Sequence, residues 1–265
     1  MSIDLLAPVI ALLYLAATGL QLLNIAQRQQ QLDRRVVAIG TLALVGHSII
    51  AWDGIFHGGE ASFGFFKIAA MLFLVVNIAC LLSLITRPLQ NLLVVLFPLS
   101  ALAVLVSTYA PDTDIAGSAP EGGLLAHIVS SILAYAVLTL AALQAMLVSL
   151  LDHQLRHRHT RGVVQVLPPL QLMERMLFEL LWIGVVLLSA SIATGMIFLD
   201  DMFAQQLVHK TTLTIAAWIL FTVLLWGHYQ LGWRSQTAVR FTLVGFALLV
   251  LAFFGSKLVL ELILA

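Results

Sequence analysis

The sequence predicts an all-α integral membrane protein with about eight transmembrane helices in a single domain, residues 1–265. Of its 265 residues, 61% are hydrophobic and only 10% are charged, whereas soluble domains are about 45–50% apolar and about 25% charged. The mean hydropathy of +1.04 indicates the same environment. Because a spanning helix needs about 20 apolar residues, eight spans with short connections account for nearly the whole chain.

The charges exclude several classes of protein. Thirteen basic residues balance thirteen acidic ones, so the chain lacks the positive field that attracts nucleic acid. Cys80 is the single cysteine, which leaves no intrachain disulfide, no C-x-x-C pair and no c-type haem attachment motif. A disordered protein and a water-soluble enzyme are excluded by composition, and we predict no catalytic residues.

Apolar runs broken by polar residues define the expected spans. Because runs without strand alternation satisfy their backbone in lipid as helices, each run is expected to be helical. In order, the spans are Leu5 to Ala26, Val36 to Trp52, Phe63 to Ile85, Asn91 to Tyr109, Leu124 to Leu151, Met176 to Leu199, Leu207 to Trp226 and Val239 to Leu264. The longest polar segment, Asp152 to Glu174, is expected between the fifth and sixth spans.

Orientation follows from the basic residues. All ten arginines lie in or directly next to the first, third, fifth and seventh connections, and basic residues mark cytoplasmic loops. The sequence therefore predicts that both termini lie outside. No basic residue precedes Arg28, so the first apolar stretch is interpreted as a retained helix rather than a cleaved signal peptide.

Two histidines are candidate iron ligands at the outer face. His127 begins the fifth span and His209 begins the seventh, so both enter the membrane from the same side. Imidazole is a common axial ligand of haem iron, and one cofactor could lie between them. The alternative is that each is an interfacial histidine bonded near the lipid headgroups.

His47 and His228 are further candidates. His47 lies about 16 Å into the second span, and an ionisable side chain at that depth is a functional-site hypothesis by default. The alternative is a neutral histidine bonded to a neighbouring helix. His228 ends the seventh span, about 28 Å from His209 along the helix, so the two cannot bind one metal ion.

The inner loop carries His153, His157 and His159, whose i,i+4 spacing could hold a metal ion. The interleaved Arg156 and Arg158 would repel a cation, so a solvated basic loop is the better interpretation.

The three lysines, Lys67, Lys210 and Lys257, all lie near the predicted outer face, opposite to the arginines. Ion pairing or snorkelling explains such residues without a ligand. The functional alternative is that they meet an anionic ligand, such as the carboxylates of a haem.

Motifs in the last ninety residues resemble the cytochrome c assembly family, the CcsA/CcmC group of membrane haem handlers. They are His209-Lys210-Thr211 through Trp218, then Trp226-Gly227-His228 and Gly232-Trp233-Arg234. His127 with Ser131 and Tyr135 resembles the family's outer histidine at the start of a helix. The chain as a whole is similar to the YpjD/HemX-like branch, and the eight-helix plan covers nearly its full length.

The resemblance implies a multi-pass protein of the bacterial inner membrane that binds haem b near the outer face and serves cytochrome c maturation. The tryptophan-rich WWD segment of the assembly enzymes is absent, since Thr194 to His209 takes its place, and Lys257 stands where a second outer histidine is expected. These departures favour haem binding or regulation over delivery of haem to an apocytochrome.

Two hypotheses remain open. In the first, the protein binds haem through His127 and His209, with Lys210, Lys257, His228 and His47 as further cofactor-binding candidates. In the second, it is a cofactor-free regulatory or partner subunit of a membrane transporter complex. A transporter in its own right has no support, because paired deep acids and matching broken helices are absent. The expected partners are haem, the lipid bilayer and another membrane protein, but no nucleic acid.

Overall fold

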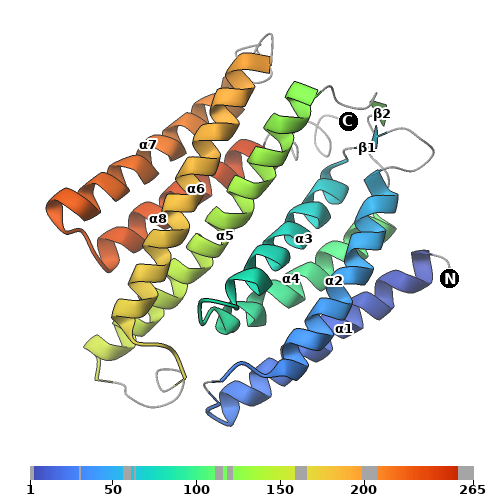
Figure 1. Ribbon diagram of the computed structural model, residues 1–265, viewed down its shortest axis with the longest axis horizontal. Helices are drawn as coiled ribbons and strands as arrows, with labels where there is room; N and C mark the ends of the chain where they lie inside the picture. The colour runs from blue at the N-terminus through green and yellow to red at the C-terminus, as the bar shows by residue number, and fades with distance from the viewer. Residues whose placement is uncertain are drawn as a thin grey trace. The chain divides into compact units, whose positions relative to one another are not determined.

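The computed structural model describes residues 3–29, 31–55, 61–62, 64–110, 116–117, 122–158, 166–198 and 208–255. Within these residues, eight helices are long and apolar enough to cross a membrane, which confirms the predicted fold class and makes the chain a multi-pass membrane protein. The chain divides into two compact units, shown in Figure 1. Unit 1 contains α1 to α4 and unit 2 contains α5 to α8.

Unit 1 is built from four helices, each of which contacts its neighbours around a ring. They are α1 (Ile3–Ala26), α2 (Arg34–Ile55), α3 (Phe65–Ser83) and α4 (Leu93–Tyr109), with a short 3-10 turn, η2 (Gln90–Leu92), before α4. Tyr14, Ile10 and Phe97 are almost fully buried at its centre. Two-residue strands β1 (Ala61–Ser62) and β2 (Ala116–Gly117) pair antiparallel, a feature that the sequence did not predict.

Proline explains one interhelical contact in unit 1. Pro8 lies inside α1, and because proline has no amide hydrogen, it cannot bond the carbonyl of the residue four positions earlier, Asp4. The hydroxyl of Tyr109 on α4 donates to that carbonyl instead. The polar group that proline leaves open is thus satisfied by the neighbouring helix.

The start of α2 is capped by the residue before it. The Asp33 carboxylate accepts hydrogen bonds from the backbone amide of Arg35 at 2.8 Å and from the Asn24 side chain at 3.2 Å. An aspartate in this position satisfies a helix N-terminus. The Arg35 amide, followed by the Asn24 amide group, holds the pKa of Asp33 below its ordinary value.

Unit 2 is a second ring of four helices: α5 (Gly122–Arg156), α6 (Leu170–Phe198), α7 (Val208–Leu231) and α8 (Gln236–Val250). A π-helical turn, η4 (Leu251–Gly255), continues α8. The longest pair, α5 and α6, packs most extensively (Figure 1). Gly184 of α6 permits this approach, because a Cβ there would lie 2.5 Å from a methyl carbon of Leu138 on α5.

The structure corrects the predicted helix ends. Residues 152–156 and 170–174 were expected in a polar connection but are helical in α5 and α6. Apolar runs report how much helix lies in lipid, whereas good helix formers such as Gln, Glu, Leu and Arg extend a helix into the headgroup region. The last part of the eighth span, from residue 256 onward, lies outside the described residues.

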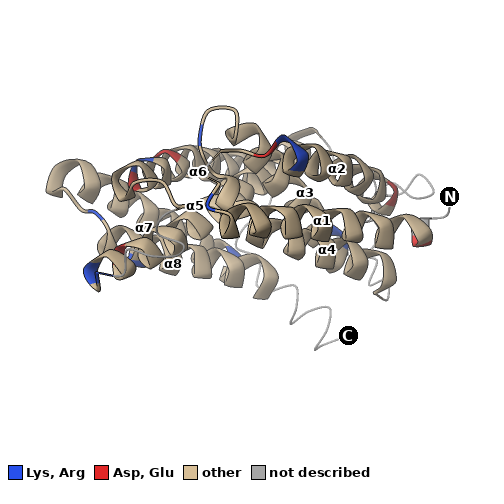
Figure 2. Cartoon of the chain, turned by 90° about the horizontal axis from the view of Figure 1, so that it is seen from below, with Lys and Arg blue, Asp and Glu red and all other residues tan. Residues whose placement is uncertain are grey.

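Charged residues are sparse and lie mainly near helix ends (Figure 2). In each unit, the connections that carry arginine share one end, which we call the arginine end. The opposite end holds Lys67 at the start of α3 in unit 1 and Lys210 at the start of α7 in unit 2, and we call it the lysine end. Arginine and lysine therefore lie at opposite ends within each unit, and the orientation prediction depends on this distribution.

Candidate functional site

His127 lies at the lysine end of unit 2, in the second turn of α5. It is half-buried, and its Nδ1 lies 2.8 Å from the backbone carbonyl oxygen of Ser191 on α6. A carbonyl oxygen can only accept, so Nδ1 must carry the proton in this contact. The other ring nitrogen, Nε2, then keeps its lone pair, which is the arrangement that metal-binding histidines use.

Small hydroxyl side chains fix this part of α5 against α6. Ser131 Oγ donates to the carbonyl oxygen of His127 at 2.7 Å and lies 2.6 Å from Ser191 Oγ. Ser130, next to Ser131 on α5, has its Oγ 3.5 Å from Oγ1 of Thr194, which lies one turn after Ser191 on α6. These contacts hold the backbone of the His127 turn in a fixed position relative to the Ser191 carbonyl.

An aromatic wall continues from the same face of α5. Tyr135, two turns after His127, donates its hydroxyl to the carbonyl oxygen of Leu249 on α8 at 2.6 Å. Its ring lies 5.6 Å from that of Phe253 in η4. The Nζ of Lys210 lies over the Phe253 ring, 5.2 Å from its centroid, a cation–π contact.

Lys210 shares the lysine end of unit 2 with His127, because it lies in the first turn of α7. The structure therefore brings together an imidazole, a cation and two aromatic rings from α5, α7 and η4. We call His127, Tyr135, Lys210 and Phe253 the His127 cluster.

His209 lies at the same end of unit 2 as His127, but on another helix. It is exposed at the second position of α7, and within the described part of the chain its side chain makes no hydrogen bond. Because α5 and α7 each contact α6 and α8, they lie diagonally across the unit. His127 and His209 share an end, as predicted, but no direct contact joins them.

His228 lies at the arginine end of unit 2. Its Nδ1 is 2.8 Å from the Trp233 carbonyl oxygen, and its ring stacks on Phe178 with centroids 3.5 Å apart. Trp233 also packs against Gly227, where a Cβ would lie 2.3 Å from the indole. The motif Trp226-Gly227-His228 thus shapes the α7–α8 connection.

His47 is fully buried in unit 1. Its Nδ1 lies 3.1 Å from the Tyr14 hydroxyl on α1, and the two rings meet edge to face. Its Nε2 is buried without a hydrogen-bond partner among the described residues. The interpretation as a histidine bonded to a neighbouring helix fits these contacts. Lys257 lies outside the described residues.

Three residues that contact His127, His47 or Lys210 were not expected from the sequence. Ser191 acts through its backbone carbonyl, which no side-chain pattern reports, and Tyr14 looks like any core aromatic. Phe253 is placed by the π-helical turn, which adds a residue to the helical repeat and re-aims the following side chains. The described residues contain no group of three or more His, Cys, Asp or Glu side chains that could hold a metal ion.

Comparison with known proteins agrees with this plan. The family model for the cytochrome c assembly protein matches residues 35–264. The inner membrane protein YpjD of Escherichia coli (strain K12) is 31% identical over 262 residues, which cover 97% of this chain and 99% of that protein. An uncharacterized 28.8 kDa protein of Azospirillum brasilense is 31% identical over 213 residues, 80% of this chain and 78% of its own length. No solved structure matches. The chain therefore belongs to the cytochrome c assembly protein family.

Proposed function

We propose that this protein binds haem b at the lysine end of unit 2, with His127 as an axial ligand. The observation that carries the proposal is the contact between His127 Nδ1 and the Ser191 carbonyl oxygen. This contact fixes the orientation of the ring and leaves the lone pair of Nε2 available to a metal ion. Membership of the cytochrome c assembly family supports haem iron as the metal.

The residues around His127 fit such a group. Tyr135 and Phe253 offer an aromatic wall for an apolar macrocycle. Lys210 offers a cation for the propionate carboxylates, and Lys257 is a second candidate for that role. His209 is the best candidate for the second axial ligand, because it begins α7 at the same end of the unit. A bound haem would supply an iron centre whose spin state reports its axial ligands.

The cellular role that we propose is haem handling or regulation at the outer face of a bacterial inner membrane. A relative that covers nearly the full chain is named an inner membrane protein. The segment that replaces the tryptophan-rich WWD motif, residues 194–209, contains no tryptophan, which favours this role over delivery of haem to an apocytochrome.

The visible spectrum of the purified protein tests the proposal. We expect a Soret band, either as purified or after titration with haem. His127→Ala should weaken or shift it, whereas His157→Ala should not, because His157 is exposed at the arginine end and its Nδ1 bonds the carbonyl of its own helix. His47→Ala and His228→Ala extend the series to the buried and stacked histidines.

A protein that stays colourless throughout a haem titration would contradict haem binding. That outcome would favour the cofactor-free partner subunit, for which co-purification with another membrane protein is the corresponding measurement.

A further inference from the structure

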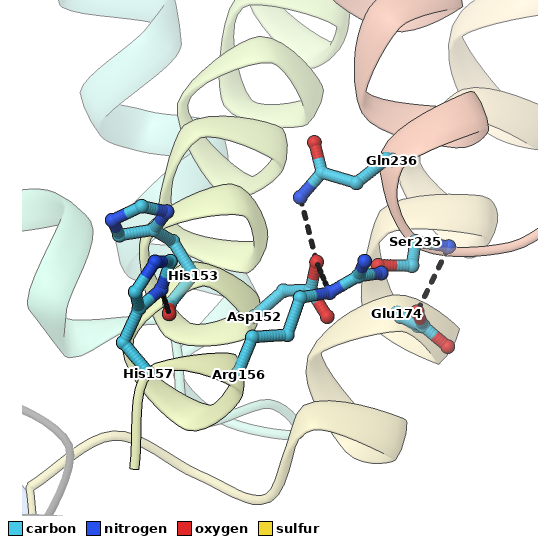
Figure 3. Close-up of polar contacts among 7 residues, drawn as sticks. All are labelled: Asp152, His153, Arg156, His157, Glu174, Ser235 and Gln236. Atoms are coloured by element: carbon cyan, nitrogen blue, oxygen red, sulfur yellow. Dashed lines mark hydrogen bonds and ion pairs between the residues drawn. The ribbon is translucent and has the colours of Figure 1, made fainter. Parts of the chain in front are cut away.

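Two carboxylates at the arginine end of unit 2 accept hydrogen bonds from neighbouring elements (Figure 3). Asp152 of α5 accepts from the Gln236 amide at 2.7 Å and from Arg156 Nε at 3.1 Å. Glu174 of α6 accepts from the backbone amide of Ser235 at 3.0 Å. These contacts join the end of α5, the start of α6 and the start of α8, and we call them the carboxylate clamp.

The clamp leaves exposed arginines without a carboxylate. Arg158, Arg175, Arg234 and Arg240 are all exposed, and none forms an ion pair with another residue that the structure describes. Arg175 follows Glu174 directly and Arg234 precedes Ser235 directly, so the bond between Glu174 and Ser235 brings the backbone positions of these two arginines close together. The arginine end of unit 2 therefore carries exposed positive charge on two connections and two helices.

The backbone at this surface is held in an unusual conformation. Ser235 has φ 46° and ψ −118°, a positive-φ geometry that is strained for a residue with a side chain. Gly232 precedes it with φ 68°. Trp233, between them, packs on Gly227 and accepts from His228. The connection that presents Arg234 is therefore fixed by contacts with α6 and α7.

Aromatic residues give the depth of this surface in the bilayer. Trp182 of α6 donates from Nε1 to the Tyr229 hydroxyl of α7 at 2.8 Å, and both side chains are exposed. Exposed Trp and Tyr mark the boundary between hydrocarbon and headgroups. Arg175 lies seven residues before Trp182, about 10 Å further out along the helix, which is the level of lipid phosphates.

We propose that the arginine end of unit 2 binds the headgroups of anionic phospholipids, with Arg175 and Arg234 as its principal phosphate ligands. The planar guanidinium matches phosphate geometry, and the membrane supplies anionic phosphate at this depth. The positive-inside distribution of basic residues orients a protein as it inserts into the membrane. For that purpose it is enough that positive charge lies near the cytoplasmic loops. Orientation does not require arginines from separate elements to lie at neighbouring backbone positions, as the Glu174–Ser235 bond places Arg175 and Arg234.

Quenching by brominated lipid tests the proposal on the full-length protein. The protein is reconstituted in phosphatidylcholine vesicles that contain brominated phosphatidylglycerol, and tryptophan quenching is compared with that by brominated phosphatidylcholine. Trp182, Trp226 and Trp233 are the reporters at this end. We expect phosphatidylglycerol to be enriched about the protein, by about fivefold for each arginine that contacts it, with enrichment falling as salt is raised.

Matched charge removals separate this site from the general charge of the protein. Arg175→Gln with Arg234→Gln should abolish most of the enrichment. Arg28→Gln with Arg34→Gln removes the same charge from exposed positions in unit 1 and should leave most of the enrichment in place, because neither residue is a proposed phosphate ligand. Equal quenching by the two lipids in the wild-type protein, or equal loss of enrichment in both double variants, would overturn the proposal.

A second measurement guards against a folding artefact. Thermal unfolding of the Arg175→Gln/Arg234→Gln protein in neutral detergent should match the wild type, because neither side chain has a partner among the described residues. Added phosphatidylglycerol should raise the unfolding temperature of the wild type more than that of the variant. An equal rise in both proteins would place the lipid elsewhere.

Discussion

His127 on α5 and Ser191 on α6 are 64 residues apart in sequence, yet the imidazole Nδ1 of one lies 2.8 Å from the carbonyl oxygen of the other. This bond orders the histidine without using a second side chain, and it leaves the opposite ring nitrogen available. In a chain with eight histidines, it distinguishes His127 from the exposed His209.

The orientation prediction can be checked with reporter fusions. Alkaline phosphatase fused after residues 111–123 should be active, because that connection is expected outside. Fusion after residues 156–161 should be inactive, because arginine-rich loops are retained in the cytoplasm. The reverse pattern would place His127 and His209 on the cytoplasmic side and remove the outer-face site.

The Tyr14–His47 pair predicts a coupling between α1 and α2. Tyr14→Phe leaves His47 Nδ1 buried without its partner, which should destabilise the protein by about 1–3 kcal/mol. Adding His47→Phe to Tyr14→Phe should cost less than the sum of the two single changes, because the unpaired nitrogen is then gone. Thermal unfolding of the four proteins gives the double-mutant cycle. Strict additivity would show that the hydrogen bond contributes nothing.

Glycine-to-alanine substitutions at Gly184 and Gly19 compare a closely packed position with an open one. Gly184→Ala adds a Cβ that would lie 2.5 Å from Leu138, so the α5–α6 pair must separate or distort, at a cost of about 1–3 kcal/mol. Gly19→Ala, in α1, meets nothing within 4 Å and should be neutral or stabilising through helix propensity. Unfolding temperatures of the two variants in the same detergent should therefore move in opposite directions or differ clearly. Equal shifts would contradict the close approach of α5 and α6.

The expected spans follow from hydropathy, because lipid requires long apolar helices and little else. Hydropathy does not predict which face of each helix packs against its neighbours. In a bilayer the lipid-facing side chains are as apolar as the core, so the sequence does not report which side of α5 meets α6. The Tyr14–His47 and Asp152–Gln236 contacts depend on that rotation, and for this reason the individual histidines could be named but not their partners.

Substitutions of the lysines test whether the carboxylates of the proposed haem ligand contact these side chains. If Lys210 meets a haem carboxylate, Lys210→Gln should lower haem affinity about ten- to a hundredfold, the effect of losing about 1.5–3 kcal/mol of charge-assisted contact. Lys257→Gln should act in the same direction, and Lys257→His should alter the spin state of the iron if that position replaces a ligand. Lys67→Gln in unit 1 is the control for loss of charge. Affinities unchanged in all four variants would leave the lysines as interfacial anchors.

Rescue of a cavity variant tests the central claim most directly. His127→Gly removes the proposed ligand while leaving its space, and the Soret band should weaken or shift in the purified, haem-titrated protein. Added imidazole should restore the wild-type spectrum in His127→Gly but leave His157→Gly unaffected, because only the first would lack a ligand to iron. A wild-type Soret band in His127→Gly without imidazole would contradict His127 as an axial ligand.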